Sequence, residues 1–148
     1  MRSGPSHRLT PKPLSSPPAC YKKNMNWTAV GALLLACAVA LGAFGAHGLK
    51  GRLDAYALGV YEKAVLYHFL HALGILLVAL LGRVGAISAA GEARTGWLLL
   101  AGIVLFSCSL YVLAISGIRA LGAITPLGGL AFIAGWLMLA YEALRSPR

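Results

Sequence analysis

Four stretches without a charged residue constrain this chain more than any other feature of its sequence. They contain 26, 19, 24 and 22 residues and lie between Lys23 and Lys50, Lys63 and Arg83, Arg94 and Arg119, and Arg119 and Glu142. An α-helix rises about 1.5 Å per residue, so roughly 20 apolar residues span a hydrocarbon core about 30 Å thick. Each stretch is therefore long enough, or nearly so, to cross a membrane.

The composition argues against a soluble domain. Hydrophobic residues make up 59% of the chain and charged residues only 11%, whereas soluble domains carry about 25% charged residues. In lipid, only helices and closed barrels satisfy every backbone polar group, and the alternating pattern of barrel strands is absent. We predict an all-α membrane four-helix bundle with short loops and with helices over about 27–48, 62–82, 96–116 and 120–141.

The first 24 residues differ from the rest of the chain. They hold five of the seven prolines, together with Ser, Lys and Arg, and such a composition cannot bury enough apolar surface to become ordered. We predict a disordered N-terminal tail over 1–24 and a four-span domain over 25–148. A cleaved secretory signal is the competing interpretation of the first span, but its length and the three following spans favour a retained helix.

Two connections carry their own signals. Leu49, Leu53, Tyr56 and Val60 recur at spacings of four, three and four, which suits a short interfacial helix, while a solvated turn is the alternative. The connection over 116–119 is so short that the third and fourth spans must form a tight antiparallel hairpin.

The basic residues predict an orientation in the cell (inner or plasma) membrane. With four spans, the side that holds the tail and the C-terminus carries nine Lys and Arg residues, and the opposite side carries four. The positive-inside rule then predicts that both termini are cytoplasmic. If translation begins at Met25, the count is four against four and the rule gives no orientation.

The net charge of +9 does not indicate a nucleic-acid partner. Five of the thirteen basic residues lie in the tail, and the others are scattered between the spans. Cys20, Cys37 and Cys108 show no CxxC spacing, so no disulfide framework or redox motif is predicted. The predicted partners are membrane lipids, with a second copy of the chain or another membrane protein as a further partner.

Small residues recur along the first and last spans, where they let neighbouring helix backbones approach closely. The predicted packing residues are Ala38, Gly42, Gly45, Ala46, Gly122, Gly128, Gly129 and Gly135. Pro126 lacks a backbone donor and is predicted to kink the fourth span.

A set of polar residues is predicted to share one half of the bilayer. His68 and His71 are three residues apart and can face the same groove, and the depth of the other members follows from the helical rise. The predicted cluster contains His47, His68, His71, Ser109, Tyr111 and Thr125. Either these side chains make structural hydrogen bonds, or they form a ligand, metal or proton site.

Catalytic signatures are absent from the sequence. There is no HExxH, GxSxG, P-loop or CxxCH motif and no pair of acids within a span. No carboxylate lies among the histidines to complete a zinc site. We therefore predict no enzyme, no metal site and no cofactor.

Three stretches resemble a known family of small integral membrane proteins, the YgdD-like proteins, catalogued as domain of unknown function 423. They read "GALLLACAVALGAFGAHGLK" at 31–50, "YHFLHALGILLVAL" at 67–80 and "AGIVLFSCSLYVLAISGIRALGAITPLGGLAFIAGWLMLA" at 101–140. The family pattern covers most of 27–141, and the tail lies outside it. Cys108 and His68 depart from that pattern, which argues against a metal site that depends on His68. The resemblance implies a multi-span membrane protein and supplies no substrate.

Two functional hypotheses follow. The leading one is a non-enzymatic packing or assembly component whose spans associate through glycine and alanine faces. The alternative is a small transporter, or a ligand-binding or metal-binding membrane protein, that uses a cavity near His47, His71 and Thr125.

Overall fold

The structure, a computed structural model, describes residues 25–145; the predicted tail over 1–24 lies outside the described residues, as do 146–148. Within the described part every element is helical, which confirms the all-α prediction. The elements are α1 (Trp27–Phe44), the π-helix η1 (Gly45–Leu49), α2 (Ala55–Arg83), α3 (Ala89–Gly102), the π-helix η2 (Ile103–Cys108), α4 (Ser109–Ser116), the 3-10 helix η3 (Arg119–Ala123) and α5 (Thr125–Arg145).

These elements join into four helices that are long and apolar enough to cross a membrane. In the described part of the chain they run over Trp27–Leu49, Ala55–Arg83, Ala89–Ser116 and Arg119–Arg145. The four predicted spans are therefore present, in the predicted order.

The second and third spans each begin seven residues earlier than predicted, because side-chain caps set their starts and charges do not. The second begins after Asp54, whose carboxylate accepts a hydrogen bond from the N–H of Ala57 at 2.7 Å. The third begins after Ser88, whose hydroxyl accepts one from the N–H of Gly91 at 2.9 Å. Such caps satisfy backbone donors that a helix leaves free at its N-terminus.

The connection after the first span is a short turn. Gly51 takes a positive φ of 84° within it, which glycine adopts without strain, and α2 starts at Ala55. The segment over 49–61 is thus neither a separate interfacial helix nor a solvated turn along its whole length, because most of it belongs to α2.

The fourth span is divided near Pro126. The 3-10 helix η3 ends at Ala123, and α5 begins at Thr125. Pro126 therefore lies in the first turn of α5, where a missing N–H removes no intrahelical hydrogen bond. The structure has a junction at Ile124, in place of the predicted kink within one continuous helix.

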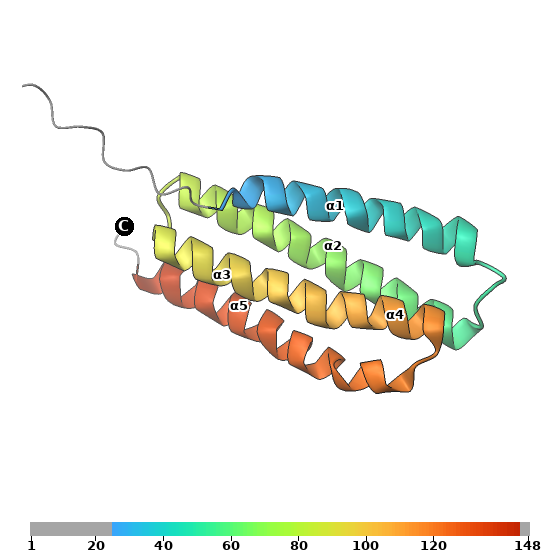
Figure 1. The fold of residues 1–148 in the computed structure, drawn as a ribbon. Coiled ribbons are helices and arrows are strands. Elements are labelled where there is room, and N and C mark those ends of the chain that lie inside the picture. Colours follow the sequence, from blue (N-terminus) through green and yellow to red (C-terminus); the bar gives the residue numbers. More distant parts are fainter. Residues whose placement is uncertain (1–24, 146–148) are drawn as a thin grey trace, which may run out of the picture.

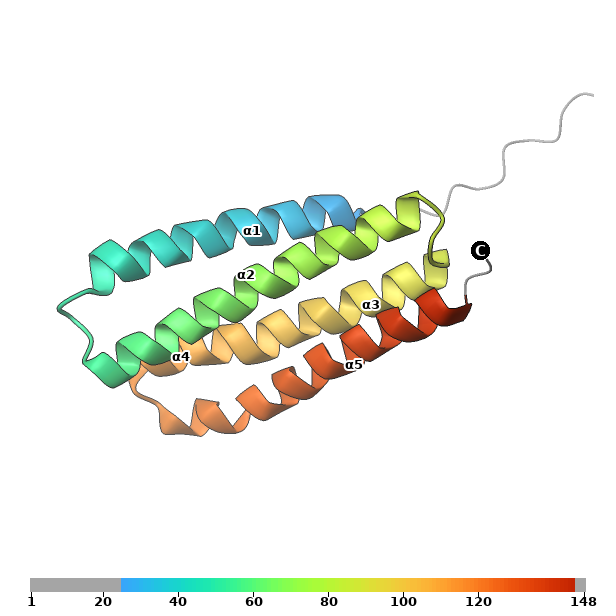
Figure 2. The same cartoon turned by 180° about the vertical axis from the view of Figure 1, so that it is seen from behind.

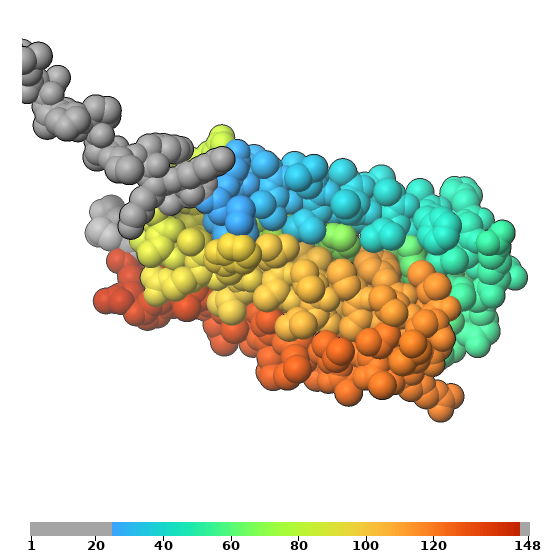
Figure 3. All heavy atoms as spheres, in the orientation of Figure 1, coloured from blue at the N-terminus to red at the C-terminus, as the bar shows by residue number. Residues whose placement is uncertain are grey.

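The middle of the bundle consists of α2 and the span formed by α3, η2 and α4, with α1 and α5 on opposite sides (Figures 1 and 2). The helix α1 packs mainly on α2, and α5 packs mainly on α3 and η2. Figure 3 shows one side of the molecule, where α1 and the third span cover α2 except for small green patches. Both described ends lie at one end of the bundle, which we call the termini end. The connections at 50–54 and 117–118 lie at the other, the turn end (Figure 1).

Two clusters of buried side chains form the core. The larger cluster centres on Ile75, Leu99 and Phe132, and the smaller one, nearer the turn end, on Tyr61 and Tyr111. Many large apolar side chains point outward instead, among them Leu66, Leu70, Leu73, Leu77 and Leu80 on α2 and Leu127, Leu130, Ile133 and Leu137 on α5. Soluble monomers rarely expose apolar patches of this extent, so this surface suits lipid.

Candidate functional site

The polar residues of the predicted cluster are positioned by α2, η2, α4 and the start of α5. His68 on α2 and Tyr111 on α4 are both buried, and the His68 Nδ1 lies 3.4 Å from the Tyr111 hydroxyl. Tyr111 also packs against Tyr61, with 5.0 Å between the ring centroids. These contacts join the second and third spans through an aromatic and polar seam.

His71 has a separate environment one turn along α2. Its Nδ1 lies 2.7 Å from the carbonyl oxygen of Tyr67. Because a carbonyl oxygen only accepts hydrogen bonds, Nδ1 carries the proton, and Nε2 of the neutral ring is left as an acceptor. The imidazole stacks on the Phe132 ring of α5 with 3.4 Å between centroids. His71 is therefore fixed by packing and by a local hydrogen bond.

The hydroxyl groups of Ser109 and Thr125 join α4 to α5. Their oxygens lie 3.0 Å apart, and the Ser109 hydroxyl also donates to the carbonyl of Phe106 at 2.9 Å. Phe106 belongs to the π-helix η2, whose wider turn leaves carbonyls that need other donors. These hydroxyls therefore fill backbone bonding positions at the end of η2.

The structure does not bring His47 into this cluster. His47 lies in η1 near the turn end and is exposed. His68 and His71 bond to different partners. In the described residues, no three His, Cys, Asp or Glu side chains lie close enough to hold one metal ion.

Two polar atoms near the seam have no hydrogen-bond partner within the described chain. They are the Nε2 of His68 and the hydroxyl of Ser107, and both are buried. Buried polar atoms usually have partners, so the region between α2 and η2 can still bond a small polar molecule.

The π-helix η1 depends on the close approach of Tyr61. The Tyr61 hydroxyl donates to the Leu41 carbonyl at 2.9 Å, and the same carbonyl also accepts from the N–H of Gly45. A Cβ at Gly45 would lie 2.6 Å from the Tyr61 ring. A side-chain hydroxyl thus enters the backbone ladder where the helix widens, and this requires glycine at position 45.

The small residues predicted to pack divide into two groups. The structure buries Ala38, Gly45, Gly128 and Gly135, and it partly buries Gly42. Ala46 is exposed, and a Cβ at Gly122 or Gly129 would meet only ordinary van der Waals neighbours.

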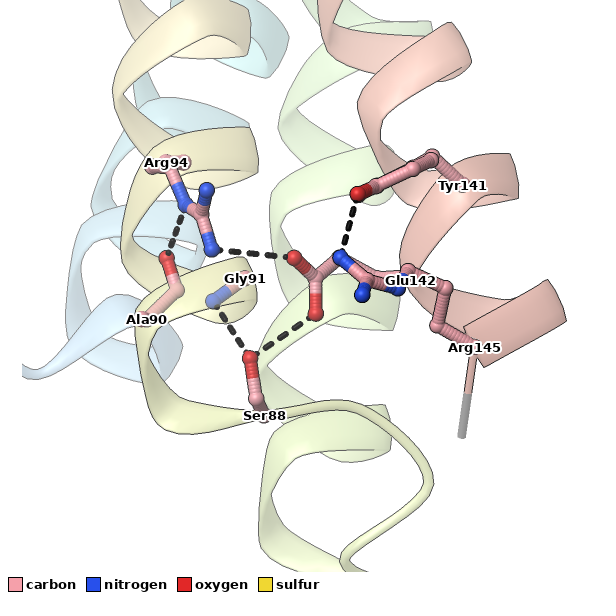
Figure 4. Close-up of polar contacts among 7 residues, drawn as sticks. All are labelled: Ser88, Ala90, Gly91, Arg94, Tyr141, Glu142 and Arg145. Carbon is pink, nitrogen blue, oxygen red and sulfur yellow. Dashed lines mark hydrogen bonds and ion pairs between the residues drawn. The ribbon is translucent and has the colours of Figure 1, made fainter. Parts of the chain in front are cut away.

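A polar network at the termini end was missed by the sequence reasoning. The Glu142 carboxylate on α5 accepts hydrogen bonds from Arg94 at 3.0 Å and from the Ser88 hydroxyl at 2.8 Å (Figure 4). Gly91 makes room for it, because a Cβ there would overlap the Glu142 carboxyl group. Hairpin register could have found it, since Arg94 and Glu142 lie 23 and 24 residues from the turn at Gly117 and Ile118.

Two surface hollows lie away from the seam. One, of about 370 Å³, lies between α1 and α2 beside Gly42, Ala46 and Phe69. The other, of about 440 Å³, lies at the turn end beside Asp54 and Arg119. Neither is lined by His47, His71 or Thr125.

Comparison with known proteins places these features in a family. The family model described as "Protein of unknown function (DUF423)" matches residues 41–129. The chain is 50% identical over 117 residues to the UPF0382 membrane protein YwdK of Bacillus subtilis, which covers 78% of this chain and 94% of that protein. It is 51% identical over 110 residues to a UPF0382 membrane protein of Staphylococcus haemolyticus, covering 74% and 88%. No solved structure matches this chain. With its four apolar helices, the chain is a membrane protein that belongs to the DUF423 family.

Proposed function

We propose that this protein is a non-catalytic membrane component that pairs with a second copy of itself through the outer surface of α1. The observation that carries this proposal is a row of exposed alanines on that helix, which we call the alanine stripe: Ala29, Ala32, Ala36, Ala40 and Ala43. Their spacings of three, four, four and three residues align them along one side of the helix.

The alanine stripe points away from the rest of the bundle. Successive residues of an α-helix are about 100° apart, so the stripe lies roughly 160° from the buried positions Gly31 and Ala38. No described helix covers this side of α1, which packs mainly on α2. The stripe is therefore directed to the surroundings of the bundle.

A second copy is the occupant that best fits a flat, regular row of small side chains. Association of helices in lipid relies on close van der Waals packing, which small residues permit. Closed two-fold pairs are the commonest oligomers, and each partner then contributes the same surface. His47 is exposed beyond Ala43 at the end of the stripe. In a parallel pair, the two His47 rings would meet near the symmetry axis at the membrane boundary.

The non-catalytic part of the proposal is supported by the hydrogen bonds of the buried polar groups. The histidines contact Tyr111 and the carbonyl of Tyr67, and Ser109 contacts Thr125. A nucleophile needs a base within hydrogen-bond reach, and no serine, threonine or cysteine bonds to a histidine in the described part of the chain.

Disulfide crosslinking in native membranes tests the pairing. Cys20, Cys37 and Cys108 are replaced by serine, and a single cysteine is introduced by Ala36→Cys. The matched control is Leu130→Cys, on the exposed outer surface of α5. A disulfide requires Cα atoms within about 7 Å, so we expect a crosslinked dimer for Ala36→Cys only. Equal crosslinking at both positions, or none at either, contradicts the pairing.

We also infer that the protein lies in the cell (inner or plasma) membrane with both termini cytoplasmic. Support comes from the excess of basic residues on the side that holds the tail and from the common end of the bundle shared by Met25 and Arg145 (Figure 1). A reporter that is active only in the cytoplasm, fused after Arg148, should be active. An inactive fusion beside an active one inserted at Gly51 would reverse the orientation.

A second candidate function is the binding or transport of a small ligand near the histidines. The unpaired Nε2 of His68 and hydroxyl of Ser107 favour it, although His47 lies outside this region. Purified protein should then retain a metal, haem, lipid or other small molecule that is lost in His71→Ala. No bound molecule, and no change in the variant, removes this candidate.

A further inference from the structure

The hollow at the turn end has the size of a small-molecule site. Its volume of about 440 Å³ lies within the range of about 300–1,000 Å³ that is usual for such sites. Its lining comes from the start of α2, the end of α4 and η3, and includes Asp54, Tyr56, Val60, Leu113 and Arg119. Three of the four spans therefore contribute to it.

The hollow presents two opposite charges that are free to bond a ligand. The Asp54 carboxylate accepts one hydrogen bond, from the N–H of Ala57 through Oδ1. Its other oxygen has no hydrogen bond within residues 25–145, and the Arg119 guanidinium has none there either. Although both side chains line the hollow, they do not form an ion pair with each other.

The depth of these charges matches the headgroup layer of a membrane. Asp54 immediately precedes the second span, Arg119 begins the fourth, and the third ends at Ser116. Val60 and Leu113 lie further along their spans, toward the hydrocarbon core. The hollow is thus charged at the level of lipid headgroups and apolar beneath it.

We propose that this hollow binds the headgroup of a phospholipid that carries both a phosphate and an ammonium group. The Arg119 guanidinium presents several N–H donors that can bond two phosphate oxygens at once. The Asp54 carboxylate accepts the ammonium group, and the same carboxylate repels a lipid whose headgroup is only anionic. This site is independent of the pairing through α1, because it uses none of the residues of the alanine stripe.

Native mass spectrometry of the full chain in neutral detergent tests this site. The protein is titrated with phosphatidylethanolamine and with phosphatidylglycerol, and the number of retained lipids is counted. We expect tighter binding of phosphatidylethanolamine. Because a hydrogen bond to a charged group is lost, Asp54→Asn should weaken its binding about tenfold and abolish the preference over phosphatidylglycerol. Arg119→Gln should weaken the binding of both lipids.

Asp54→Asn is informative because asparagine caps helices as well as aspartate does, so α2 keeps its start while the charge is removed. The matched control is Arg52→Gln, at an exposed basic residue of the same end that does not line the hollow; its lipid binding should be unchanged.

Two results would overturn the proposal. The first is an unchanged lipid preference in Asp54→Asn, or losses in Arg52→Gln equal to those in Arg119→Gln. The second is complete displacement of the lipid by millimolar inorganic phosphate, which would identify a site for a soluble anion. Failure of displacement by phosphate and by soluble phosphoethanolamine supports a membrane source of the ligand.

Discussion

The two outer helices, α1 and α5, are held to the bundle by different contacts. At Gly128 of α5, a Cβ would overlap the backbone nitrogen of Phe106 in η2, so the two backbones are in direct contact. At Gly45, the first residue after α1, the neighbour is the side-chain ring of Tyr61. A side chain can shift to accommodate a larger residue, whereas two packed backbones cannot. The attachment of α5 is therefore the more rigid of the two.

The outer surfaces of the same helices differ as well. The helix α5 exposes Leu127, Leu130 and Ile133, which are large side chains that mix well with lipid chains. The helix α1 exposes the alanine stripe along the middle of its outer surface. Both surfaces are apolar, so the difference lies in shape: α5 is suited to fluid lipid, and α1 to another regular helix.

The largest effect is expected from Gly128→Ala, which tests the rigid attachment of α5. The added methyl group meets the backbone of η2 and must push the helices apart, which should lower the free energy of unfolding by about 2–3 kcal/mol. Unfolding in mixed micelles measures this change. The control is Gly129→Ala, whose Cβ would lie 3.9 Å from Phe106. Equal losses in both variants would contradict a backbone contact specific to Gly128.

A smaller effect is expected from Glu142→Gln, which removes the ion pair that ties α5 to α3 at the termini end. The loss should be about 1–2 kcal/mol, because the Arg94 side chain is 54% exposed and water replaces part of the interaction. The control is Glu62→Gln, at an exposed acid that forms no ion pair within the described residues. If chemical denaturation shows the same stability for Glu142→Gln and wild type, the ion pair contributes nothing measurable.

Tyr61→Phe should have a smaller effect still, on the attachment of α1. It removes the hydroxyl that bonds the Leu41 carbonyl, at an expected cost of about 1 kcal/mol. That carbonyl keeps the N–H of Gly45 as a partner, which limits the loss. The control is Tyr56→Phe, at a tyrosine that is 76% exposed. A thermal melt in detergent in which both variants shift alike would mean that the Leu41 bond does not stabilise α1.

The number and order of the spans could be predicted because lipid imposes simple requirements of length and apolarity. The helix starts could not be predicted from charges, since Glu62 and Lys63 lie on the exposed side of α2 and do not interrupt it. The caps at Asp54 and Ser88 were the better signal, because they satisfy the free backbone donors directly.

The candidate site could be predicted only in depth along the membrane normal. Depth follows from counting residues, and His68 and Tyr111 do meet. The direction of a side chain around its helix depends on how the helices rotate against each other. This rotation is fixed by contacts distant in sequence, such as Tyr61 with Leu41, so the exposure of His47 did not follow from its position.

The smallest effect on the folded monomer, and the most direct test of the comparison between α1 and α5, is expected from Ala36→Leu combined with Ala40→Leu. Both positions are exposed, so the free energy of unfolding should change by no more than about 0.5 kcal/mol. The larger side chains hold two copies of α1 apart, and energy transfer between labelled chains in vesicles should therefore fall. The reciprocal change on α5, Leu127→Ala with Leu130→Ala, should leave the transfer unchanged. If both pairs of substitutions affect transfer equally, the alanine stripe has no special role and the two outer helices are equivalent toward lipid.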